Sequence, residues 1–361
     1  MTAGVYLHVP FCAAKCPYCD FYSQRGQEAD YDRYLAAMLR AIACFDGRLE
    51  ADTLYFGGGT PVLLGAERLI TLLNAARDRF GSGQTEITLE ANPCAVDEPM
   101  LRRLAEGGFN RISFGVQSMN DSTLRVLGRR HTAERASEML WAAHRAGFAH
   151  ISADLMLAVP EQCIEEIEAS IKALAALPVD HLSAYLLKLE PGTAFANRYA
   201  EPDEDFAADC YLKMVESCVQ QGFLQYEISN FAKNKSAQSR HNLKYWRCRP
   251  YLGIGPAAHS FYNGRRFYFP RNFAAFTAAA NPWAVTVDDG PGGDEAERLM
   301  LGLRLSGGVR FDDFPDAFTI RMKKKAPSLA AAGLLIAADN GIRLTTKGFL
   351  LSNAVIAALL S

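Results

Sequence analysis

The sequence predicts an α/β protein: a partial, TIM-like (β/α)6 barrel followed by a small, winged-helix-like C-terminal domain. Two observations lead to this fold class. Short apolar runs alternate with amphipathic helical patterns through roughly the first 230 residues, and a helix–hairpin–helix pattern ends the chain. Six strand–helix units are fewer than the eight of a closed barrel, so the barrel should be open. An open, doubly wound sheet is the alternative.

Six short runs rich in apolar residues are expected to be the strands of the barrel. They cover residues 4–8, 53–56, 86–90, 111–116, 151–157 and 181–187. Helices are expected between them, the first over residues 31–45, whose apolar side chains share one face, and the second over residues 66–79. Because connections between parallel strands are right-handed, this repetition indicates a parallel sheet.

The last part of the chain carries the pattern of a small separate domain. Residues 286–297 include Asp-Asp-Gly-Pro-Gly-Gly-Asp and are expected to be an exposed connection, and a helix should cover residues 295–305. The sequence Asp339-Asn-Gly between two apolar runs indicates a tight hairpin, and Thr346 is expected to cap a final helix that ends near Leu360. Such domains sometimes bind DNA, but the acidic balance of the chain favours packing against the main domain.

At 361 residues the chain is long for one core, so a large domain with a smaller appendage is expected. Residues 1–235 should form the partial barrel. Residues 236–287 should form an extension that closes the barrel, and residues 288–361 the C-terminal helical domain.

Composition excludes several classes of protein. The chain is 49% hydrophobic and 22% charged, as in ordinary globular proteins, and its net charge of -2 does not favour a nucleic-acid binder. Its longest apolar stretch, Leu329–Ala338, is too short to span a bilayer, so no transmembrane segment is expected. Nine scattered cysteines and a start without a signal-peptide pattern favour a reducing cytoplasm.

Three cysteines, Cys12, Cys16 and Cys19, stand close together after the first expected strand. Closely spaced thiolates can hold an iron–sulfur cluster, but a four-iron cubane then keeps one iron for a ligand outside this motif. Position 21, where a fourth thiolate could stand, is Phe21. A structural zinc site with His8 as fourth ligand is the alternative, although a strand-end loop followed by a glycine strip is not the pattern of a zinc knuckle.

Polar residues and glycines also follow the other expected strands. In parallel sheets functional groups gather at the carboxyl ends of the strands, so these residues should converge on the cysteines. They are the strip Gly57-Gly58-Gly59-Thr60-Pro61, then Glu90, Gln117, Arg129 and Asp154.

The cysteine spacing and the glycine strip together resemble the radical S-adenosylmethionine superfamily. In that superfamily three cysteines ligate a 4Fe–4S cluster, and S-adenosylmethionine chelates the fourth iron through its amino and carboxylate groups. The resemblance extends over nearly the whole chain and implies a partial barrel of the radical SAM type. Within the superfamily, the opening strand with Tyr6 and His8 is similar to that of the coproporphyrinogen-dehydrogenase-like group.

The resemblance implies roles for individual residues. The cluster ligands are Cys12, Cys16 and Cys19. The residues that match contacts to the cluster-bound cofactor are Tyr6, Tyr18, Gly58 and Glu90. Those that match contacts to a second S-adenosylmethionine molecule are Gly59, Thr60, Gln117, Arg129 and Asp154. The aromatic ring of Tyr18 suits packing on the adenine, and glycines let the backbone approach the ligand closely.

Two departures separate the chain from the dehydrogenases of this group. Phe21 replaces their extra cysteine, and only eleven residues precede Cys12, where the dehydrogenases have a longer extension. Cys-Pro-Tyr-Cys-Asp-Phe without the extra cysteine resembles the heme-chaperone branch, and so does the segment His241-Asn-Leu-Lys-Tyr-Trp246. This resemblance implies that the protein binds heme and delivers it to acceptor proteins, whose identity the sequence does not give.

His241 is the candidate heme contact, because imidazole can ligate heme iron and the neighbouring aromatic and arginine side chains could meet the macrocycle and its propionates. The alternative is that these aromatics seal the open side of the barrel. The role of the cluster also stays open between assembly of a homodimer and reductive release of heme. The alternative function is that of an oxygen-independent coproporphyrinogen dehydrogenase, in which a radical formed from S-adenosylmethionine starts an oxidative decarboxylation.

Overall fold

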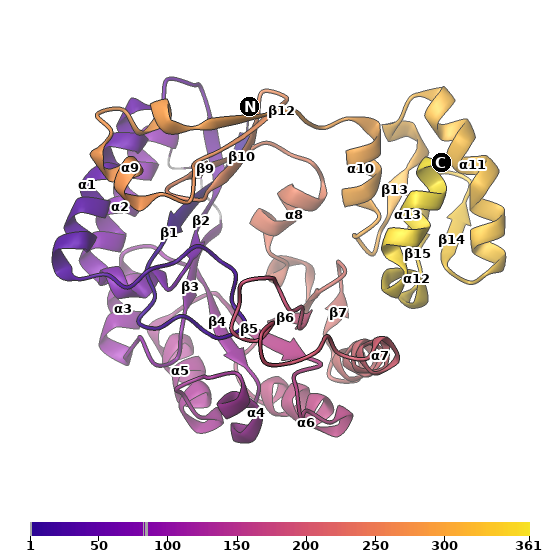
Figure 1. Cartoon of the computed structure of the whole chain (residues 1–361), viewed down its shortest axis with the longest axis horizontal. Coiled ribbons are helices and arrows are strands. Elements are labelled where there is room, and N and C mark those ends of the chain that lie inside the picture. Colours follow the sequence, from indigo (N-terminus) through magenta and orange to yellow (C-terminus); the bar gives the residue numbers. More distant parts are fainter. Residues whose placement is uncertain (1, 82, 84–85) are drawn as a thin grey trace.

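A computed structural model describes residues 2–81, 83 and 86–361. Within these residues, one sheet of twelve strands forms the main part of the molecule, and a three-stranded sheet belongs to the C-terminal part (Figure 1). The order in the large sheet is β12-β11-β10-β9-β1-β2-β3-β4-β5-β6-β8-β7. The sheet is therefore an open one, as the sequence predicts.

Six parallel strands, β1 to β6, stand in sequential order at the centre of this sheet. Their bounds are Thr2–Val9, Glu50–Gly58, Glu86–Ala91, Arg111–Gln117, His150–Leu157 and His181–Leu186. All six expected strands are confirmed. A doubly wound sheet would reverse its strand order part-way, and this one does not, so the partial barrel is the correct description.

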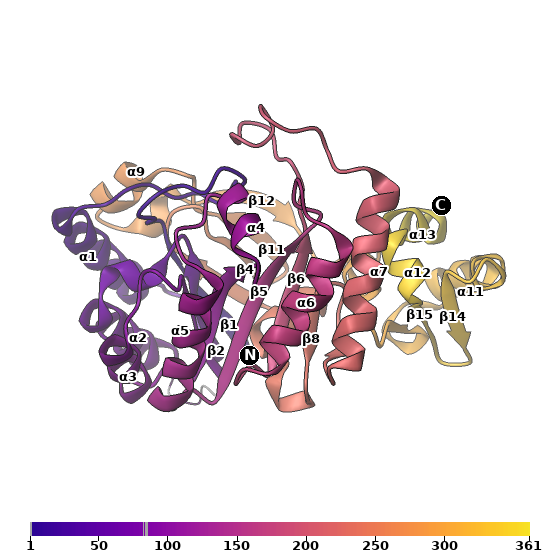
Figure 2. The ribbon, with the colours of Figure 1, turned by 90° about the horizontal axis from the view of Figure 1, so that it is seen from below.

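Helices connect these strands and cover the outer face of the sheet (Figures 1 and 2). Their bounds are α1 Glu28–Cys44, α2 Ala66–Phe80, α3 Glu98–Glu106, α4 Asp121–Val126, α5 Ala133–Ala146, α6 Ile164–Ala175 and α7 Glu204–Gln220. Sequential strands with right-handed crossovers place every connecting helix on the same side of the sheet. The opposite face of the sheet is therefore free of these helices and can carry a functional site.

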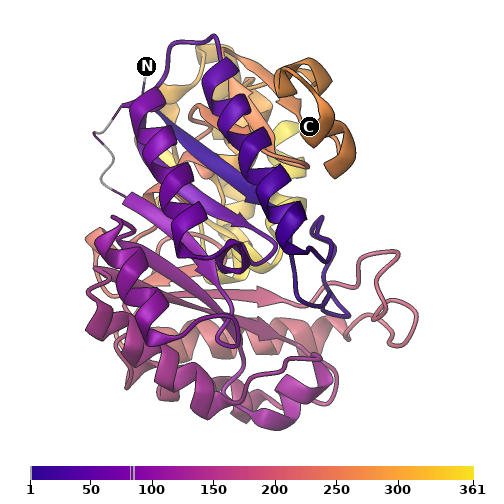
Figure 3. The same cartoon turned by 90° about the vertical axis from the view of Figure 1, so that its left-hand side faces the viewer.

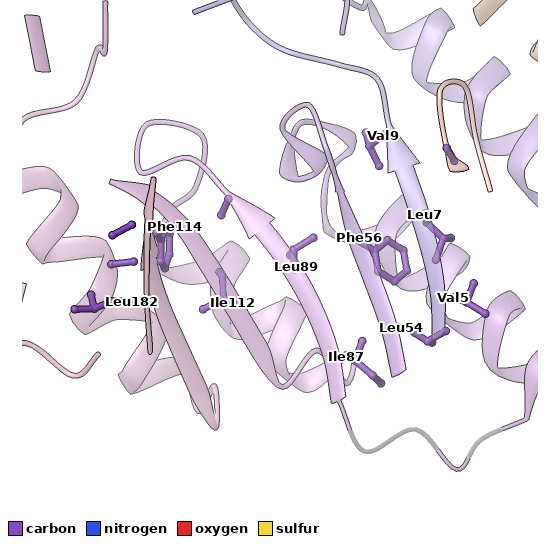
Figure 4. Packing of buried hydrophobic residues seen from close by; sticks show 14 of the residues in the cluster. Val5, Leu7, Val9, Leu54, Phe56, Ile87, Leu89, Ile112, Phe114 and Leu182 are labelled. Carbon is purple, nitrogen blue, oxygen red and sulfur yellow. The ribbon is translucent and has the colours of Figure 1, made fainter. Parts of the chain in front are cut away.

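Strand alternation gives the six strands one apolar face and one polar face. The apolar residues that pack under the helices include Val5, Leu7, Val9, Leu54, Phe56, Ile87, Leu89, Ile112, Phe114 and Leu182 (Figure 4). The residues between them include Tyr6, His8, Thr53, Tyr55, Glu86, Thr88, Glu90, Arg111, Ser113, Ser152, Asp154, His181 and Ser183. The core thus lies between sheet and helices, and polar chemistry lines the inside of the barrel.

Later parts of the chain extend both edges of the sheet. On one side, β9 pairs in parallel with β1, and an antiparallel series follows it. The bounds are β9 Tyr251–Ile254, β10 His259–Tyr262, β11 Arg265–Tyr268 and β12 Val287–Pro291, with α9 Phe273–Ala278 between the last two. On the other side lie β8 Asn230–Ala232 and β7 Leu224–Gln225. The described residues also include four short 3-10 helices: Pro61–Leu64 after β2, then Lys235–Ala237, Pro282–Val285 and Phe311–Asp313.

Strand β12 corrects one expectation from the sequence. Residues 286–297 were expected to be a connection, but Val287–Pro291 pairs with the free edge of β11. Most of its side chains are exposed, so no apolar pattern marks it as a strand. The division at 235 and 287 stays a prediction, and β12 crosses its second boundary.

Helix α8, Arg240–Trp246, enters the polar face of the sheet near the amino ends of β1 to β3 (Figure 1). Glu86 receives the start of this helix, because its carboxylate oxygens accept hydrogen bonds from the backbone N–H groups of Arg240 at 2.9 Å and His241 at 2.8 Å. Gly4 leaves room for it, since a Cβ there would lie 2.9 Å from the His241 ring. Helix α8 therefore closes the barrel interior at that end.

The C-terminal part packs against the main part, as the sequence favours. Helix α10 contacts α8, and α12 contacts α7. The bounds are α10 Glu295–Gly302, β13 Val309–Arg310, α11 Asp316–Ala331, β14 Leu335–Ala338, β15 Gly341–Leu344, α12 Thr346–Leu350 and α13 Ser352–Leu360. The hairpin is confirmed, but Thr345 caps α12 in place of Thr346, through a bond from the N–H of Gly348. No helix in the described ranges is long and apolar enough to cross a membrane.

Candidate functional site

The loop after β1 carries the three cysteines over the carboxyl ends of the strands. Backbone hydrogen bonds hold its start, because Phe11 accepts from the N–H of Thr60 at 2.7 Å and Val9 from that of Gly59 at 2.8 Å. Its tip is held by the segment between β6 and α7, where the N–H of Phe195 donates to Pro17 at 3.0 Å. Figure 3 shows this segment protruding on the same side as the loop.

Cys12, Cys16 and Cys19 line a cavity of about 700 Å³ that opens at this end of the barrel. Eight other residues predicted from the sequence line the same cavity. They are Tyr18, Gly58, Gly59, Thr60, Glu90, Gln117, Arg129 and Asp154. Residues from four strands and three loops are thus brought together as the strand-end argument predicts.

The glycine strip places backbone where side chains would not fit. Gly58 has a φ of 109°, a conformation that favours glycine, and a Cβ there would lie 2.5 Å from the His8 ring. A Cβ on Gly59 would lie 2.5 Å from the backbone oxygen of Phe11. The strip therefore ties the end of β2 to the base of the cysteine loop.

Glu90 stands in the cavity wall with its carboxylate fixed. It accepts hydrogen bonds from the hydroxyl of Tyr55 at 2.7 Å and from the N–H of Gly58 at 3.0 Å. Burial raises its pKa to about 7, and the nearby charge of Asp154 adds to this rise. A carboxyl group of this kind gains a cationic partner readily, because an adjacent ammonium or sulfonium favours the ionised form.

Asp154, on β5, is the second buried carboxyl group of the wall. Burial raises its pKa to about 6, against the effect of hydrogen bonds from Ser183 and Ser113. The hydroxyl of Ser113 lies 3.1 Å from its carboxylate oxygen. Two carboxyl groups with raised pKa values in one cavity suit a ligand that carries positive charge.

Arg129 and Gln117 lie on the cysteine side of the cavity. Arg129 donates to the sulfur of Cys16 at 3.5 Å and to the backbone oxygen of Gly115. Within the described part of the chain, the buried Nε of Arg129 and Oε1 of Gln117 have no hydrogen-bond partner. Gln117 also has a φ of 71°, an uncommon conformation for a residue with a side chain. These orphaned polar atoms are the groups that a polar ligand would satisfy.

Tyr6 lies behind the cavity wall, where its hydroxyl is 3.0 Å from Nδ1 of His8. The other ring nitrogen of His8, Nε2, donates to the backbone oxygen of Tyr22 at 3.0 Å. Burial lowers the pKa of His8 to about 4. With both nitrogens engaged, His8 is not placed to complete a zinc site with the cysteines.

His241 does not line the cavity. Its side chain is fully buried, with Nδ1 2.8 Å from the hydroxyl of Thr53 and Nε2 2.8 Å from that of Tyr245. Burial lowers its pKa to about 3. The prediction that His241 contacts heme finds no support in this geometry, because a metal bond would require one of these hydrogen bonds to break.

Several cavity residues were missed from the sequence, among them Tyr55, Thr88 and Arg111. They stand inside strands, and the strand-end argument does not extend to such positions. A signal was present, since polar residues recur at every second position of buried strands, as in Glu86, Thr88 and Glu90.

The residues present fit a 4Fe–4S cluster with S-adenosylmethionine. Three thiols supply soft ligands, two carboxyl groups face the same cavity, and glycine backbone lies beside them. No three Cys, His, Asp or Glu side chains in the described residues are already gathered as a metal-ligand set.

Comparison with known proteins gives consistent matches. The family model of the radical SAM superfamily matches residues 6–174, and that of the HemN C-terminal domain matches residues 296–351. The chain is 35% identical to the heme chaperone HemW of Mycobacterium tuberculosis over 99% of this chain and 94% of that protein. It is 34% identical to HemW of Bacillus subtilis over 99% of both chains.

Among solved structures, the coproporphyrinogen III oxidase HemN of Escherichia coli matches with a TM-score of 0.82. The match covers 99% of this chain and 89% of that one at 23% identity, so it shows a common fold. Fold and site together define a protein of the radical S-adenosylmethionine superfamily, whose cofactors are a 4Fe–4S cluster and S-adenosylmethionine. Within it, the chain belongs to the HemW family.

Proposed function

We propose that the protein is a heme chaperone, which binds heme beside a 4Fe–4S cluster coordinated by S-adenosylmethionine and hands the heme to acceptor proteins. Membership of the HemW family carries this proposal, because relatives named heme chaperones match nearly the full chain. Cys12, Cys16 and Cys19 would ligate the cluster, with Gly58 and Glu90 beside the cofactor. When bound, a cluster of this kind supplies reversible one-electron transfer.

Phe21 supports a heme function. It lines the mouth of the cavity and is 69% exposed, which is unusual for so large an apolar side chain. Two further exposed side chains line the same cavity, Tyr185 at 42% and Leu186 at 37%. Exposed apolar groups around a concave opening suit a flat, apolar macrocycle.

Positive charge at the same mouth supports a ligand with propionates. Lys15, Lys188 and Arg271 line the cavity together with Phe21. Each has a contact of its own: Lys15 donates to the backbone oxygen of Phe21 at 2.9 Å, Lys188 pairs with Glu190 at 2.9 Å, and Arg271 pairs with Asp20 at 3.3 Å. Cationic side chains beside an apolar platform are the groups that bind propionates.

The test is a hemin titration of the anaerobically reconstituted protein, followed by its visible spectrum, with coproporphyrinogen decarboxylation assayed on the same sample. Stoichiometric heme uptake without decarboxylation is expected. Phe21→Ala should weaken hemin binding several-fold, whereas Ile320→Ala, at a side chain 65% exposed on α11, should not. Robust decarboxylation, or an absence of hemin binding, would overturn the proposal.

A further inference from the structure

The cavity continues from the cysteines far into the barrel. On β4, the residues Arg111, Ser113, Gly115 and Gln117 all line it, and they occupy every second position of the strand. At ~3.3 Å per residue, this stretch spans on the order of 20 Å. Arg111 therefore stands at the inner end of the cavity, and the cysteines stand at its mouth.

Arg111 carries donor groups that nothing satisfies. It is 1% exposed, and neither Nη1 nor Nη2 has a hydrogen-bond partner among the residues that the structure describes. Thr88, its direct partner in the register of β3 and β4, is likewise buried with an unpartnered hydroxyl in the described chain. Two neighbouring side chains on one wall thus present unsatisfied donors to the same space.

Neighbouring polar groups at this depth do satisfy one another. The hydroxyl of Ser152 lies 2.7 Å from Nδ1 of His181, and Nε2 of His181 lies 2.7 Å from the hydroxyl of Tyr226. Arg111 and Thr88 are an exception to this pattern, because the described part of the chain offers their terminal donor groups no such partner. Buried polar groups are almost always paired in folded proteins, so this exception calls for a ligand or ordered water.

Glu86 does not supply the hydrogen-bond acceptor that the guanidinium of Arg111 lacks. Its nearest carboxylate oxygen lies 3.9 Å from Nη1, which is too far for a hydrogen bond. Both carboxylate oxygens of Glu86 instead accept from the N–H groups of Arg240 and His241 at the start of α8. Glu86 neutralises part of the charge and leaves the guanidinium edge free for another acceptor.

We propose that Arg111, with Thr88 beside it, binds a carboxylate group of a ligand held in this cavity. A guanidinium edge with two free N–H groups matches the two oxygens of a carboxylate, and the Thr88 hydroxyl adds a third donor. Asp154 and His181 face the same region, and the neighbouring carboxyl of Asp154 selects against a ligand with more than one negative charge there. The inference rests on the proposed function, since the carboxylate is either a heme propionate or that of a second S-adenosylmethionine molecule. The cluster-bound molecule uses its own carboxylate on the iron.

The first experiment uses the reconstituted wild-type protein and two pairs of ligands. S-adenosylmethionine is compared with its decarboxylated form, and hemin with hemin dimethyl ester, each by equilibrium titration. Removal of the carboxylate should weaken binding at least tenfold in one or both pairs. The cluster iron and the cationic side chains at the mouth also bind carboxylates, so the pair whose discrimination depends on Arg111 names the carboxylate that Arg111 binds. Equal affinities within both pairs would overturn the inference.

The second experiment repeats each sensitive pair with variants, and the discrimination is the ratio of the two affinities within a pair. Arg111→Gln should lower the discrimination of one pair at least threefold relative to the wild type, and Arg111→Lys should keep part of it. Arg77→Gln is the control, because Arg77 lies outside the cavity and donates to Gly108. Thr88→Val conserves shape and should lower the discrimination a few-fold, which tests the site even where Arg111→Gln does not fold. Full discrimination in folded Arg111→Gln or in Thr88→Val contradicts the inference.

The outcomes separate this inference from the proposed function. If hemin does not bind, the heme chaperone proposal is wrong, and the S-adenosylmethionine pair still tests Arg111. If hemin and its dimethyl ester bind equally well, and S-adenosylmethionine and its decarboxylated form also bind equally well, the chaperone proposal remains and the proposed role of Arg111 is wrong.

Discussion

Thr53 and His241 are hydrogen-bonded at 2.8 Å, although 188 positions of sequence separate them. The bond joins β2 to α8 inside the barrel, and both residues are buried. The segment that marks the heme-chaperone branch therefore begins with a residue that holds the fold together. This relationship gives His241 a structural role whose energetic weight can be measured.

Replacement of His241 by Gln should destabilise the protein by about 1–3 kcal/mol at pH 7.5, because Thr53 and Tyr245 would lose one or both bonds. The pKa of His241 is lowered to about 3 in the folded protein, so unfolding takes up a proton below pH 6.5. The contribution of neutral His241 to the free energy of unfolding is therefore complete above pH 6.5. It falls by about 1.4 kcal/mol per pH unit as the pH decreases from 6.5 toward 3. Urea unfolding of both proteins from pH 7.5 to 5 measures the difference.

Other buried groups titrate in the same range, including His8 and His131, whose pKa values are lowered to about 4. They are common to both proteins and cancel in the difference between the two unfolding free energies. A difference that stays constant with pH would show that His241 titrates as an exposed histidine, against the structure.

The affinity for S-adenosylmethionine should rise as pH increases from 6 to 8. Burial raises the pKa of Glu90 to about 7, so its carboxylate becomes fully charged only above neutrality, where it can interact with the positive charge of the ligand's sulfonium. The expected change is about tenfold over this interval. Glu90→Gln should bind about tenfold more weakly at pH 8 and show little pH dependence.

Glu227 offers a matched control for Glu90. Its pKa is also raised to about 7 by burial, but it lies outside the cavity. Glu227→Gln should therefore keep the pH profile of the wild type in the same calorimetric titration. A profile flattened equally by both substitutions would assign the pH dependence to the fold and not to Glu90.

Gly59→Ala should impair cluster loading, because the added Cβ would meet the backbone of Phe11 at the base of the cysteine loop. We expect iron content after anaerobic reconstitution to fall by at least half. Gly307→Ala, where nothing lies within 4 Å of the added atom, is the control and should load normally. Normal loading in Gly59→Ala would mean that the loop does not depend on this contact.

Joint replacement of Cys12, Cys16 and Cys19 by Ser should abolish iron binding and the brown absorbance of the reconstituted protein. Cys44, Cys94 and Cys163 are exposed and lie elsewhere on the surface, so their joint replacement is the control. Iron content and absorbance should be unchanged in the control. Retained iron in the first variant is inconsistent with cluster ligation by these cysteines.

Much of the barrel could be predicted from the sequence, because its strands are apolar on one face and bounded by turns. Strand β12 could not be predicted, because its side chains are mostly exposed and it is stabilised by backbone hydrogen bonds to β11. The capping residue of α12 was placed one position late, at Thr346, because Thr345 and Thr346 carry equivalent hydroxyl groups. Tertiary context decides between such alternatives.

The candidate site was predictable where its residues follow strands, as the cysteines, Gly58 and Glu90 do. Arg111 and Thr88 could not be found in that way. From the sequence alone, a polar residue within a strand is expected to face solvent, and only the fold shows that it faces the barrel interior. His241 illustrates the opposite case, since its residue type suggests a ligand and only the fold reveals two internal partners.

The parallel pairing of β9 with β1 sets the order in which the protein can mature during synthesis. Strand β1 is synthesised long before Tyr251–Ile254 can cover its second edge and before His241 can fill the space beside Gly4. The strand that leads into Cys12 therefore lacks one neighbour until β9 has been made. A cluster can enter a fully supported loop only after that point.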